Sequence, residues 1–227
     1  MKCIYCGKES SSSKNKAHIV PEALLQNSVT LELGVECDVC NHYAKKLENA
    51  FIHHNRIHIP IMHIRSPGKG GKIRKQLGNH YLDKSTSNLK FSAKPIKLTF
   101  NKSGIHAVFD DPKEFCELKF RRALYHIAFN YLAWKLGSET ANLKKYDHLR
   151  QYVRFAKVNE KLPYGQVSLP NGQIRKKLSI GFVESAPGIV VRLQTFADDF
   201  YMSLDSNIEF KNWVNQLSGH EVFYHEI

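Results

Sequence analysis

Residues 3–6 have the sequence CIYC and residues 37–40 have the sequence CDVC, so two Cys-x-x-Cys pairs stand thirty residues apart. Each pair can turn both sulfurs toward one ion, and two pairs make a tetrahedral thiolate set suited to zinc. Two redox-active dithiols or a chance spacing are the alternatives, but no thioredoxin-like βαβ pattern surrounds either pair. The spacing therefore predicts one structural Zn²⁺, bound by Cys3, Cys6, Cys37 and Cys40.

The residues that flank the second pair predict a helix and a short strand. Apolar side chains recur about every 3.6 residues between Val39 and Phe51, which indicates a helix from Cys37 to about His54. Asp38 is expected to cap its first turn. Upstream, residues 17–20 have the sequence AHIV, a strand that Pro21 ends. A unit this small buries little apolar surface, so the metal would supply much of its folding free energy.

Length and composition limit the class of protein. The chain has 227 residues, 42% of them hydrophobic, which is enough for one large domain or two small ones. No apolar run approaches the ~20 residues that a membrane-spanning helix needs. The polar, cysteine-bearing N-terminus is unlike a signal peptide. We therefore expect a cytoplasmic protein with no membrane partner, in which the cysteines are thiols or metal ligands rather than disulfides.

The net charge of +12 is concentrated in one segment. Residues 61–104 hold ten Lys or Arg and a single acidic residue, Asp83, whereas the charges of residues 1–60 and 105–227 nearly balance. A concentrated basic segment is typical of a chain that binds a polyanion, most often nucleic acid. A solvated surface loop is the alternative. The residues expected to contact DNA phosphates are Lys69, Lys72, Arg74 and Lys75.

The whole pattern predicts an α+β fold in three parts. These are a zinc-stabilised unit (1–60), a basic linker or DNA-contact segment (61–104), and an α+β domain that holds or recognises nucleic acid (105–227). In the last part, a long amphipathic helix is expected to begin at Asp111-Pro112 and to end at Gly137, with Cys116 inside it. A shorter helix is expected over residues 147–156. The expected strands are residues 94–100, 104–110, 178–184, 189–195, 200–205 and 221–225.

The role of two further groups of basic residues is ambiguous. Arg121 and Arg122 on the long helix, and the basic run that begins at Arg175, are candidates for phosphate contacts. Basic residues on a helix or a hairpin also serve simply to keep a surface soluble, and the sequence leaves both interpretations open.

The order and spacing of the N-terminal motifs resemble those of a known family. The first Cys-x-x-Cys pair, the run HIVPEAL that starts at His18, the run CDVCN that ends at Asn41, and the pair Leu47-Glu48 together resemble the four-cysteine HNH endonucleases. The resemblance covers residues 3–51, under a quarter of the chain. It implies a ββα-metal fold, in which a hairpin and a helix hold one catalytic divalent cation, with the structural zinc as a separate ion. It also implies metal-dependent hydrolysis of DNA.

The resemblance assigns roles to two residues. His18 matches the general base, and a histidine with a pKa near ~6.5 suits the removal of a proton from water at neutral pH. Taken alone, it would be a core histidine of the strand. Asn41 matches the position that binds the catalytic cation, and its side-chain oxygen is a hard ligand suited to Mg²⁺ or a similar ion.

The sequence departs from the family pattern at two positions. The residue before the catalytic histidine usually binds the metal, but here it is Ala17, which has no ligand atom. The middle position of the motif, commonly Asn, is Glu32. Glu48 is the preferred replacement ligand because it lies two helical turns after Asn41 and on the same face, although a solvated carboxylate is the alternative. The replacement candidates are Glu22, Glu32, His42 and Glu48.

Three classes of function follow. The first is a metal-dependent DNA endonuclease. The second is a zinc-stabilised nucleic-acid binding module with a degenerate nuclease site, which Ala17 makes credible. The third is a zinc-organised protein-interaction domain. Nothing in the sequence indicates the oligomeric state or the DNA sequence that would be recognised.

Overall fold

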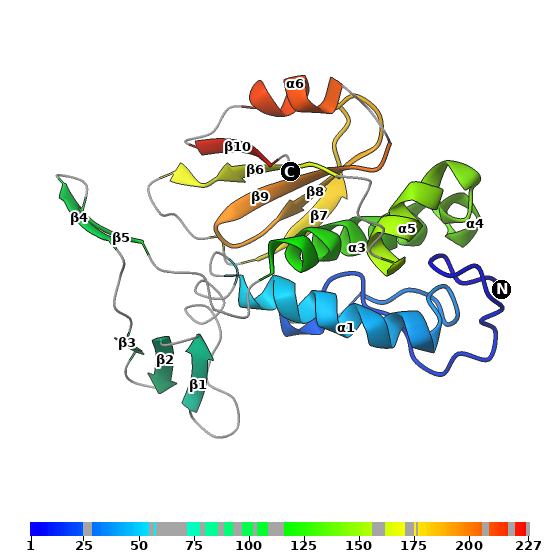
Figure 1. Cartoon of the computed structure of the whole chain (residues 1–227), viewed down its shortest axis with the longest axis horizontal. Coiled ribbons are helices and arrows are strands. Elements are labelled where there is room, and N and C mark those ends of the chain that lie inside the picture. The colour runs from blue at the N-terminus through cyan, green and yellow to red at the C-terminus, as the bar shows by residue number, and fades with distance from the viewer. Residues whose placement is uncertain are drawn as a thin grey trace.

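The architecture is taken from a computed structural model of the chain (Figure 1). It describes residues 1–24, 29–54, 57, 72–77, 80–85, 89–92, 97–101, 104–108, 116–155, 162–170, 175, 177–205, 209–217 and 221–225. Helices and antiparallel strands are mixed along the chain, so the predicted α+β class is confirmed. No helix within these ranges is both long and apolar enough to cross a membrane.

The helix after the second cysteine pair forms as predicted. Helix α1 spans Asp38–His53, with Cys37 in extended conformation at its N-cap. Its buried side chains recur at three- and four-residue intervals, which places them on one side of the helix. They are Cys40, Ala44, Leu47, Ala50 and Phe51. Val39, which the sequence pattern counted among the apolar positions, is exposed.

The strand expected at residues 17–20 is reduced to a narrow hairpin with residues 29–31. An isolated antiparallel bridge joins His18 to Thr30, and two backbone hydrogen bonds of 2.8 and 3.0 Å flank the bridge. The pairing stays short because Pro21 has no backbone N–H to extend it. A single 3₁₀ turn, Glu22–Leu24, follows.

The long helix α3, Glu117–Leu136, lies at the centre of the molecule. Figure 1 shows it between the large sheet on one side and α1 on the other. Every side chain from Phe120 to Ala133 is buried, the polar ones included. Packing between two layers explains this, because such a helix has no solvent-facing side. The predicted amphipathic helix is therefore wrong in its pattern.

The C-terminal end of α3 agrees with the sequence prediction, and its N-terminal end differs from it. Gly137 ends the helix as predicted, with φ +86°. Asp111 and Pro112 fall outside the described residues, and the described helix begins at Glu117 with Cys116 half-buried at its N-cap rather than inside it. Three short helical segments follow. They are α4 (Ser138–Ala141), the 3₁₀ turn η2 (Lys144–Tyr146) and α5 (Asp147–Phe155), the last as predicted.

A five-stranded antiparallel sheet covers one side of α3. Its strand order is β10-β6-β9-β8-β7, and its strands are β6 (Tyr164–Ser168), β7 (Ser179–Phe182), β8 (Val190–Gln194), β9 (Asp198–Ser203) and β10 (Glu221–His225). Three of the five, β7, β8 and β9, were predicted with shifted bounds, β10 was predicted with the bounds it has, and β6 was not predicted. Helix α6, Glu209–Asn215, packs on the other face of the sheet. Gly165 in β6 permits the close approach, since a β-carbon there would lie 2.8 Å from Val214.

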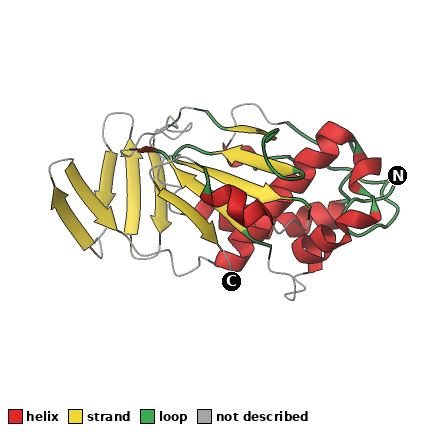
Figure 2. Ribbon diagram, turned by 90° about the horizontal axis from the view of Figure 1, so that it is seen from above, coloured by secondary structure: helices red, strands yellow, loops and turns green. Residues whose placement is uncertain are grey.

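The segment predicted as a basic linker contains strands. Strands β1 (Lys72–Leu77), β2 (His80–Ser85) and β3 (Leu89–Ser92) form an antiparallel sheet that was not foreseen. Strands β4 (Lys97–Asn101) and β5 (Gly104–Val108) form the predicted hairpin. Figures 1 and 2 show both groups at the end of the molecule that is opposite the N-terminus.

One apolar core joins the N-terminal unit to the rest of the protein. The same buried cluster contains Ile4 beside the first cysteines, Phe51 of α1, Phe120 of α3 and Phe200 of β9. The Phe51 and Phe120 rings stack at 5.6 Å, and Phe120 meets Phe200 edge-on at 5.6 Å. The first 57 residues therefore share their core with α3 rather than enclosing one of their own.

Candidate functional site

The four cysteines converge on one point, as the spacing predicts. Their sulfurs all lie within 4.8 Å of one another, and the Cys6 and Cys37 sulfurs are 3.7 Å apart. A zinc ion with four sulfurs at about 2.3 Å would hold neighbouring sulfurs about 3.8 Å apart. The set is therefore positioned to bind a metal ion and compatible with structural zinc.

Two glycines shape the turns that carry the sulfurs. Gly7 has φ +68°, which lets its amide donate to the Cys3 carbonyl at 2.9 Å. Gly34 has φ +87°, and a β-carbon there would lie 2.8 Å from the carbonyl oxygen of Ser10. Only glycine tolerates both the positive φ and this contact. The Ser10 hydroxyl donates to the Gly34 carbonyl at 2.6 Å, so the two turns are fastened to each other.

Hydrogen bonding already favours a thiolate in this cluster. The Cys40 thiol, followed by backbone N–H groups, lowers the pKa of Cys3 to about 4 against the opposing effect of burial. The amides of Cys37 and Tyr5 approach the Cys3 sulfur at 3.4 and 3.5 Å. Metal-bound thiolates need such donors around them. The local environment therefore fits a metal centre as well as the geometry does.

Asp38 does not cap α1. Its carboxylate accepts hydrogen bonds from the backbone amides of Lys14 and Asn15, each at 3.0 Å, and from the Asn15 side chain at 2.9 Å. These bonds lower the pKa of Asp38. The predicted cap is wrong because the exposed loop at residues 14–15 supplies closer donors, and Asp38 instead fastens that loop to the start of α1.

The side chain of His18 is partly accessible to solvent, as that of a general base would need to be. It is half-buried, whereas Ala17 and Ile19 on either side are only 2% exposed. Alternation along an extended segment directs the two neighbours into the core and His18 to the other face. Ala17 is part of that core, so an acidic residue at position 17 would have to be buried.

Glu48 is the replacement candidate that lies in electrostatic contact with His18. Burial raises the pKa of the half-buried Glu48 carboxyl, His126 and His18 act to lower it, and Glu36 acts to raise it. The other candidates, Glu22, Glu32 and His42, are exposed.

Asn41 and Glu48, the two predicted ligands of the catalytic cation, are separated along the axis of α1, which a helical wheel does not show. Both side chains are half-buried on α1. Seven residues advance about 10.5 Å along a helix axis, so a cation between them would be held partly through water, as Mg²⁺ commonly is. Among the described residues, the four cysteines are the only group of three or more His, Cys, Asp or Glu side chains placed to share an ion.

A buried polar cluster beneath the hairpin was missed by the sequence reasoning. The His126 Nε2 atom lies 3.3 Å from both carboxylate oxygens of Glu36. The Asn130 side-chain nitrogen donates to the His18 carbonyl at 3.2 Å and lies 3.4 Å from Glu36. All of Glu36, His126 and Asn130 are at most 2% exposed. The sequence signal was present, because His126 and Asn130 stand one helical turn apart in the otherwise apolar run ALYHIAFNYLA.

Glu36 and His126 form a buried pair. Burial acts to lower the pKa of His126, but the adjacent Glu36 carboxylate, with a smaller contribution from Glu48, outweighs burial and raises it. His126 in turn acts to lower the pKa of Glu48, so α3 contributes to the electrostatics of the hairpin site.

The basic residues that the sequence suggested as phosphate contacts lie in different parts of the structure. Lys72, Arg74 and Lys75 lie in β1, and Lys69 falls outside the described residues. Arg121 and Arg122 are buried, at 2% and 5% exposure, so they are not surface phosphate contacts. Arg122 instead donates to the carbonyls of residues 152 and 153.

Arg175 is likewise engaged within the protein. Its guanidinium pairs with Asp199 at 2.5 Å and donates to the Thr195 carbonyl at 3.0 Å. These contacts leave it a poor candidate for binding phosphate.

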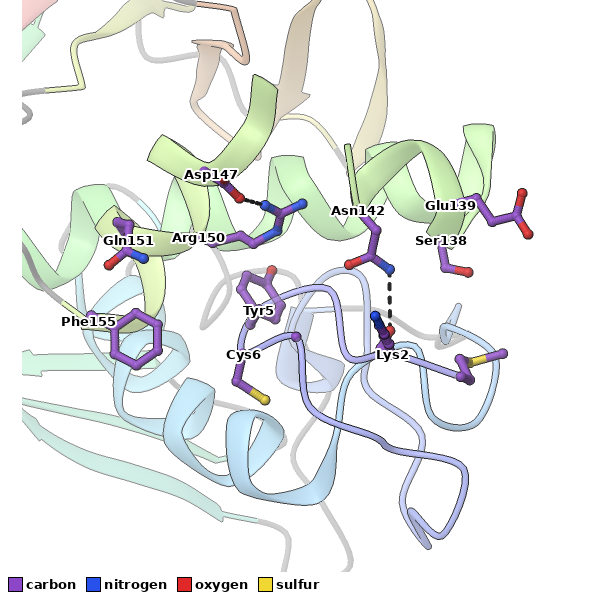
Figure 3. A pocket seen from close by; sticks show the side chains of 12 residues that line it. Lys2, Tyr5, Cys6, Ser138, Glu139, Asn142, Asp147, Arg150, Gln151 and Phe155 are labelled. Carbon is purple, nitrogen blue, oxygen red and sulfur yellow. Dashed lines mark hydrogen bonds and ion pairs between the residues drawn. The ribbon is translucent and has the colours of Figure 1, made fainter. Parts of the chain in front are cut away.

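A pocket lies beside the first cysteine pair. Figure 3 shows this cavity of about 860 Å³ between the turn at Tyr5 and Cys6 and helices α4 and α5. Arg150 lies at its wall, where its guanidinium donates to Asp147 and to three main-chain carbonyls, one of them that of Ile4. Lys2 also lines the pocket, which lies where the cysteine turn docks on the helices.

Comparison with known proteins agrees with this geometry. Residues 3–56 match a family model described as HNH endonuclease. No curated protein and no solved structure matches the chain. The matched residues include both cysteine pairs, the hairpin with His18 and helix α1. Residues 3–56 are therefore similar to the HNH endonucleases, and they carry four cysteines positioned to bind a metal ion.

Proposed function

We propose that the protein is a metal-dependent endonuclease that hydrolyses DNA phosphodiester bonds, with His18 as the general base. The observation that carries the proposal is the placement of His18 within the family-matched segment. It is half-exposed between two buried neighbours, on a hairpin that lies in electrostatic range of Glu48 on α1. Hydrolysis requires a group that takes a proton from water, and an accessible imidazole does this at neutral pH.

In this proposal a second, catalytic cation is distinct from the zinc in the four-cysteine site. Asn41 and Glu48 would hold it, with water and substrate oxygens in the remaining positions. When bound, the ion stabilises the negative charge that develops on the phosphate and the leaving oxygen. His18 removes the proton from the attacking water, and the buried Ile19 and Ala17 keep the hairpin seated on the core.

The alternative is a zinc-stabilised nucleic-acid binding module with a degenerate nuclease site. Ala17 favours it, because this side chain is in the core and has no ligand atom. Both functions require nucleic-acid binding, and they differ only in whether the hairpin performs chemistry.

The decisive experiment is cleavage of plasmid DNA with Mg²⁺, Mn²⁺ or Ni²⁺ by the parent protein and by His18→Ala. We expect the parent to cleave and the variant to lose about 10²–10⁴-fold in rate, with DNA affinity and zinc content unchanged. His148→Ala is the matched control, because His148 lies on α5 and its Nδ1 atom is hydrogen-bonded to the Lys145 carbonyl rather than to the hairpin. A parent that cleaves no DNA with any of these ions would leave the binding module as the function.

Glu48→Gln tests the proposed cation ligand in the same assay. The amide keeps the size of the side chain but removes the charge that attracts the cation, so cleavage should fall and should recover partly at high Mg²⁺. Unchanged cleavage at every Mg²⁺ concentration would remove Glu48 from the site.

A further inference from the structure

Asn130 occupies an unusual place between two functional parts of the chain. It lies in the middle of α3, is fully buried, and belongs to the residues outside the family match. Its side-chain oxygen accepts a hydrogen bond from the Tyr5 hydroxyl at 2.7 Å. Its side-chain nitrogen donates to the main-chain carbonyl of His18 at 3.2 Å.

The orientation of this amide is fixed by its partners. The His18 carbonyl can only accept a hydrogen bond, and the Glu36 carboxylate 3.4 Å away is likewise an acceptor, so the amide nitrogen must face them. The Tyr5 hydroxyl on the other side can then donate to the amide oxygen. If the amide were turned over, its oxygen would face two acceptors, the His18 carbonyl and the Glu36 carboxylate.

The two ends of the amide reach different parts of the N-terminal domain. Tyr5 stands between Cys3 and Cys6, and its ring stacks on that of His126 at 5.2 Å. His126 in turn holds Glu36, the residue before Cys37. The cysteine turns and the His18 hairpin are thus both attached to one turn of α3.

Backbone pairing within the described part of the hairpin is short. Around His18, the pairing consists of one bridge and the backbone hydrogen bonds from Ile19 to Val29 and from Leu31 to Ala17. So short a pairing gives little rigidity of its own. A catalytic group misplaced by about 1 Å can cost about 10²-fold in rate, so an additional restraint on the His18 backbone has catalytic weight.

We propose that Asn130 is a positioning residue for His18, and that it fixes the catalytic hairpin to α3 and, through Tyr5, to the metal-binding turn. The proposal rests on the proposed function of His18. It assigns α3 a part in the active site, so the family-matched domain is incomplete without this helix.

The test compares Asn130→Leu with Tyr125→Phe in the full-length, zinc-loaded protein. Tyr125 lies on the same helix and donates to the Pro163 carbonyl at 2.6 Å, so its variant also removes a partly buried hydrogen bond from α3, one that does not go to His18. We expect Asn130→Leu to lower kcat about 10- to 100-fold with KM and zinc content unchanged. Tyr125→Phe should keep the parent kcat, even where its thermal stability falls as much.

Two more variants keep the test decisive if Asn130→Leu does not fold. Asn130→Ser removes the long amide with less change in polarity and should show the same loss in kcat. Tyr5→Phe removes the anchor on the cysteine turn but leaves the donor to His18, so its loss should be smaller than that of Asn130→Ser.

A readout independent of cleavage separates this inference from the proposed function. Amide hydrogen exchange of Ile19 and Leu31 reports on the hairpin directly, and it should accelerate about tenfold or more in Asn130→Leu and Asn130→Ser but not in Tyr125→Phe. Unchanged exchange, or a kcat equal to that of Tyr125→Phe, would overturn the positioning role. Faster exchange in a protein whose parent cleaves no DNA would contradict the nuclease function while retaining Asn130 as the brace of the hairpin.

Discussion

Cys37 and Cys116 are similar at the level of the single residue but differ in their neighbours. Each is half-buried, and each stands at the N-cap of a helix in extended conformation. The Cys37 sulfur has another sulfur at 3.7 Å, whereas Cys116 belongs to no cluster of metal-ligating side chains among the described residues. A chemical difference between two such thiols must therefore come from the tertiary arrangement rather than from local conformation.

The first prediction uses this pair as variant and control. Cys37→Ser should abolish stoichiometric zinc binding and lower the free energy of unfolding by several kcal/mol, because metal binding contributes directly to folding of such sites. Cys116→Ser should keep one zinc per chain. Elemental analysis and urea unfolding measure both effects. Equal zinc content in the two variants would show that the cysteine cluster is not the zinc site.

The spacing of the cysteines could be read from the sequence because each pair is local, and a tight turn brings its two sulfurs together wherever it lies. The Glu36–His126 pair is different in kind. Its members are 90 residues apart, and no local pattern indicates that a helix from the second half of the chain will lie beneath the hairpin. A separation of 112 residues likewise hid the link between Asn130 and His18.

At the scale of elements, the first cysteine turn is docked on α4 and α5 by one buried side chain. Arg150 donates to the carbonyls of Ile4, Ala141 and Leu143 at 2.9–3.0 Å and pairs with Asp147. The planar guanidinium can serve several acceptors at once. One residue of α5 therefore connects the turn that carries Cys3 to two helical segments distant in sequence.

The second prediction follows from that connection. Arg150→Met keeps the apolar stem but leaves buried carbonyls without donors, so it should destabilise the protein by about 2–4 kcal/mol. Arg150→Lys should lose nearly as much, because one ammonium group cannot reach all three carbonyls. Lys144→Met on the neighbouring exposed turn is the control and should change stability by less than about 0.5 kcal/mol. The midpoints of urea unfolding decide the comparison, and a stable Arg150→Lys would contradict it.

Sequence reasoning found the elements that carry a strong local pattern, either apolar residues that repeat along a helix or residues that favour a turn. Helix α1 has one buried stripe, and the β7–β8 and β4–β5 hairpins are joined by turn residues. Helix α3 was found but misjudged as amphipathic, because its burial on all sides depends on two layers that meet it in the folded protein. Strand β6 and helix α6 were missed. Strand β6 pairs with β9 and β10, which are distant in sequence, and α6 packs against it across Gly165.

At the scale of the whole molecule, the excess of basic residues is concentrated in one segment of the chain. The excess of basic residues falls in residues 61–104, whose described strands lie at the end opposite the N-terminus in Figures 1 and 2. The four-cysteine site and the His18 hairpin belong to the nearly neutral first sixty residues. A DNA duplex that reaches both regions would be bound by the basic segment and hydrolysed at the His18 hairpin. DNA affinity and catalysis would then depend on separate surfaces.

The last prediction tests this separation through the basic residues of the strand segment. Lys72 to Lys75 span about 10 Å of β1 at about 3.3 Å per residue, and DNA advances 3.4 Å per phosphate along each strand. The segment is therefore long enough to lie along several neighbouring phosphates. We expect replacement of Lys69, Lys72, Arg74 and Lys75 by Gln to weaken binding to all DNA sequences alike, since phosphate contacts carry no sequence information.

The dependence of that binding on salt gives the quantitative test. Each lost phosphate contact should reduce the slope of log affinity against log salt by about 0.9, so the fourfold variant should be flatter by up to about 3.6. The control replaces Lys119, Lys135, Lys144 and Lys177, which are exposed and lie on α3, η2 and the loop before β7. It removes the same net charge and should change the slope by much less. Equal flattening in both variants would mean that net charge alone attracts the DNA, and an unchanged slope in the first would return residues 61–104 to the role of a solvated surface.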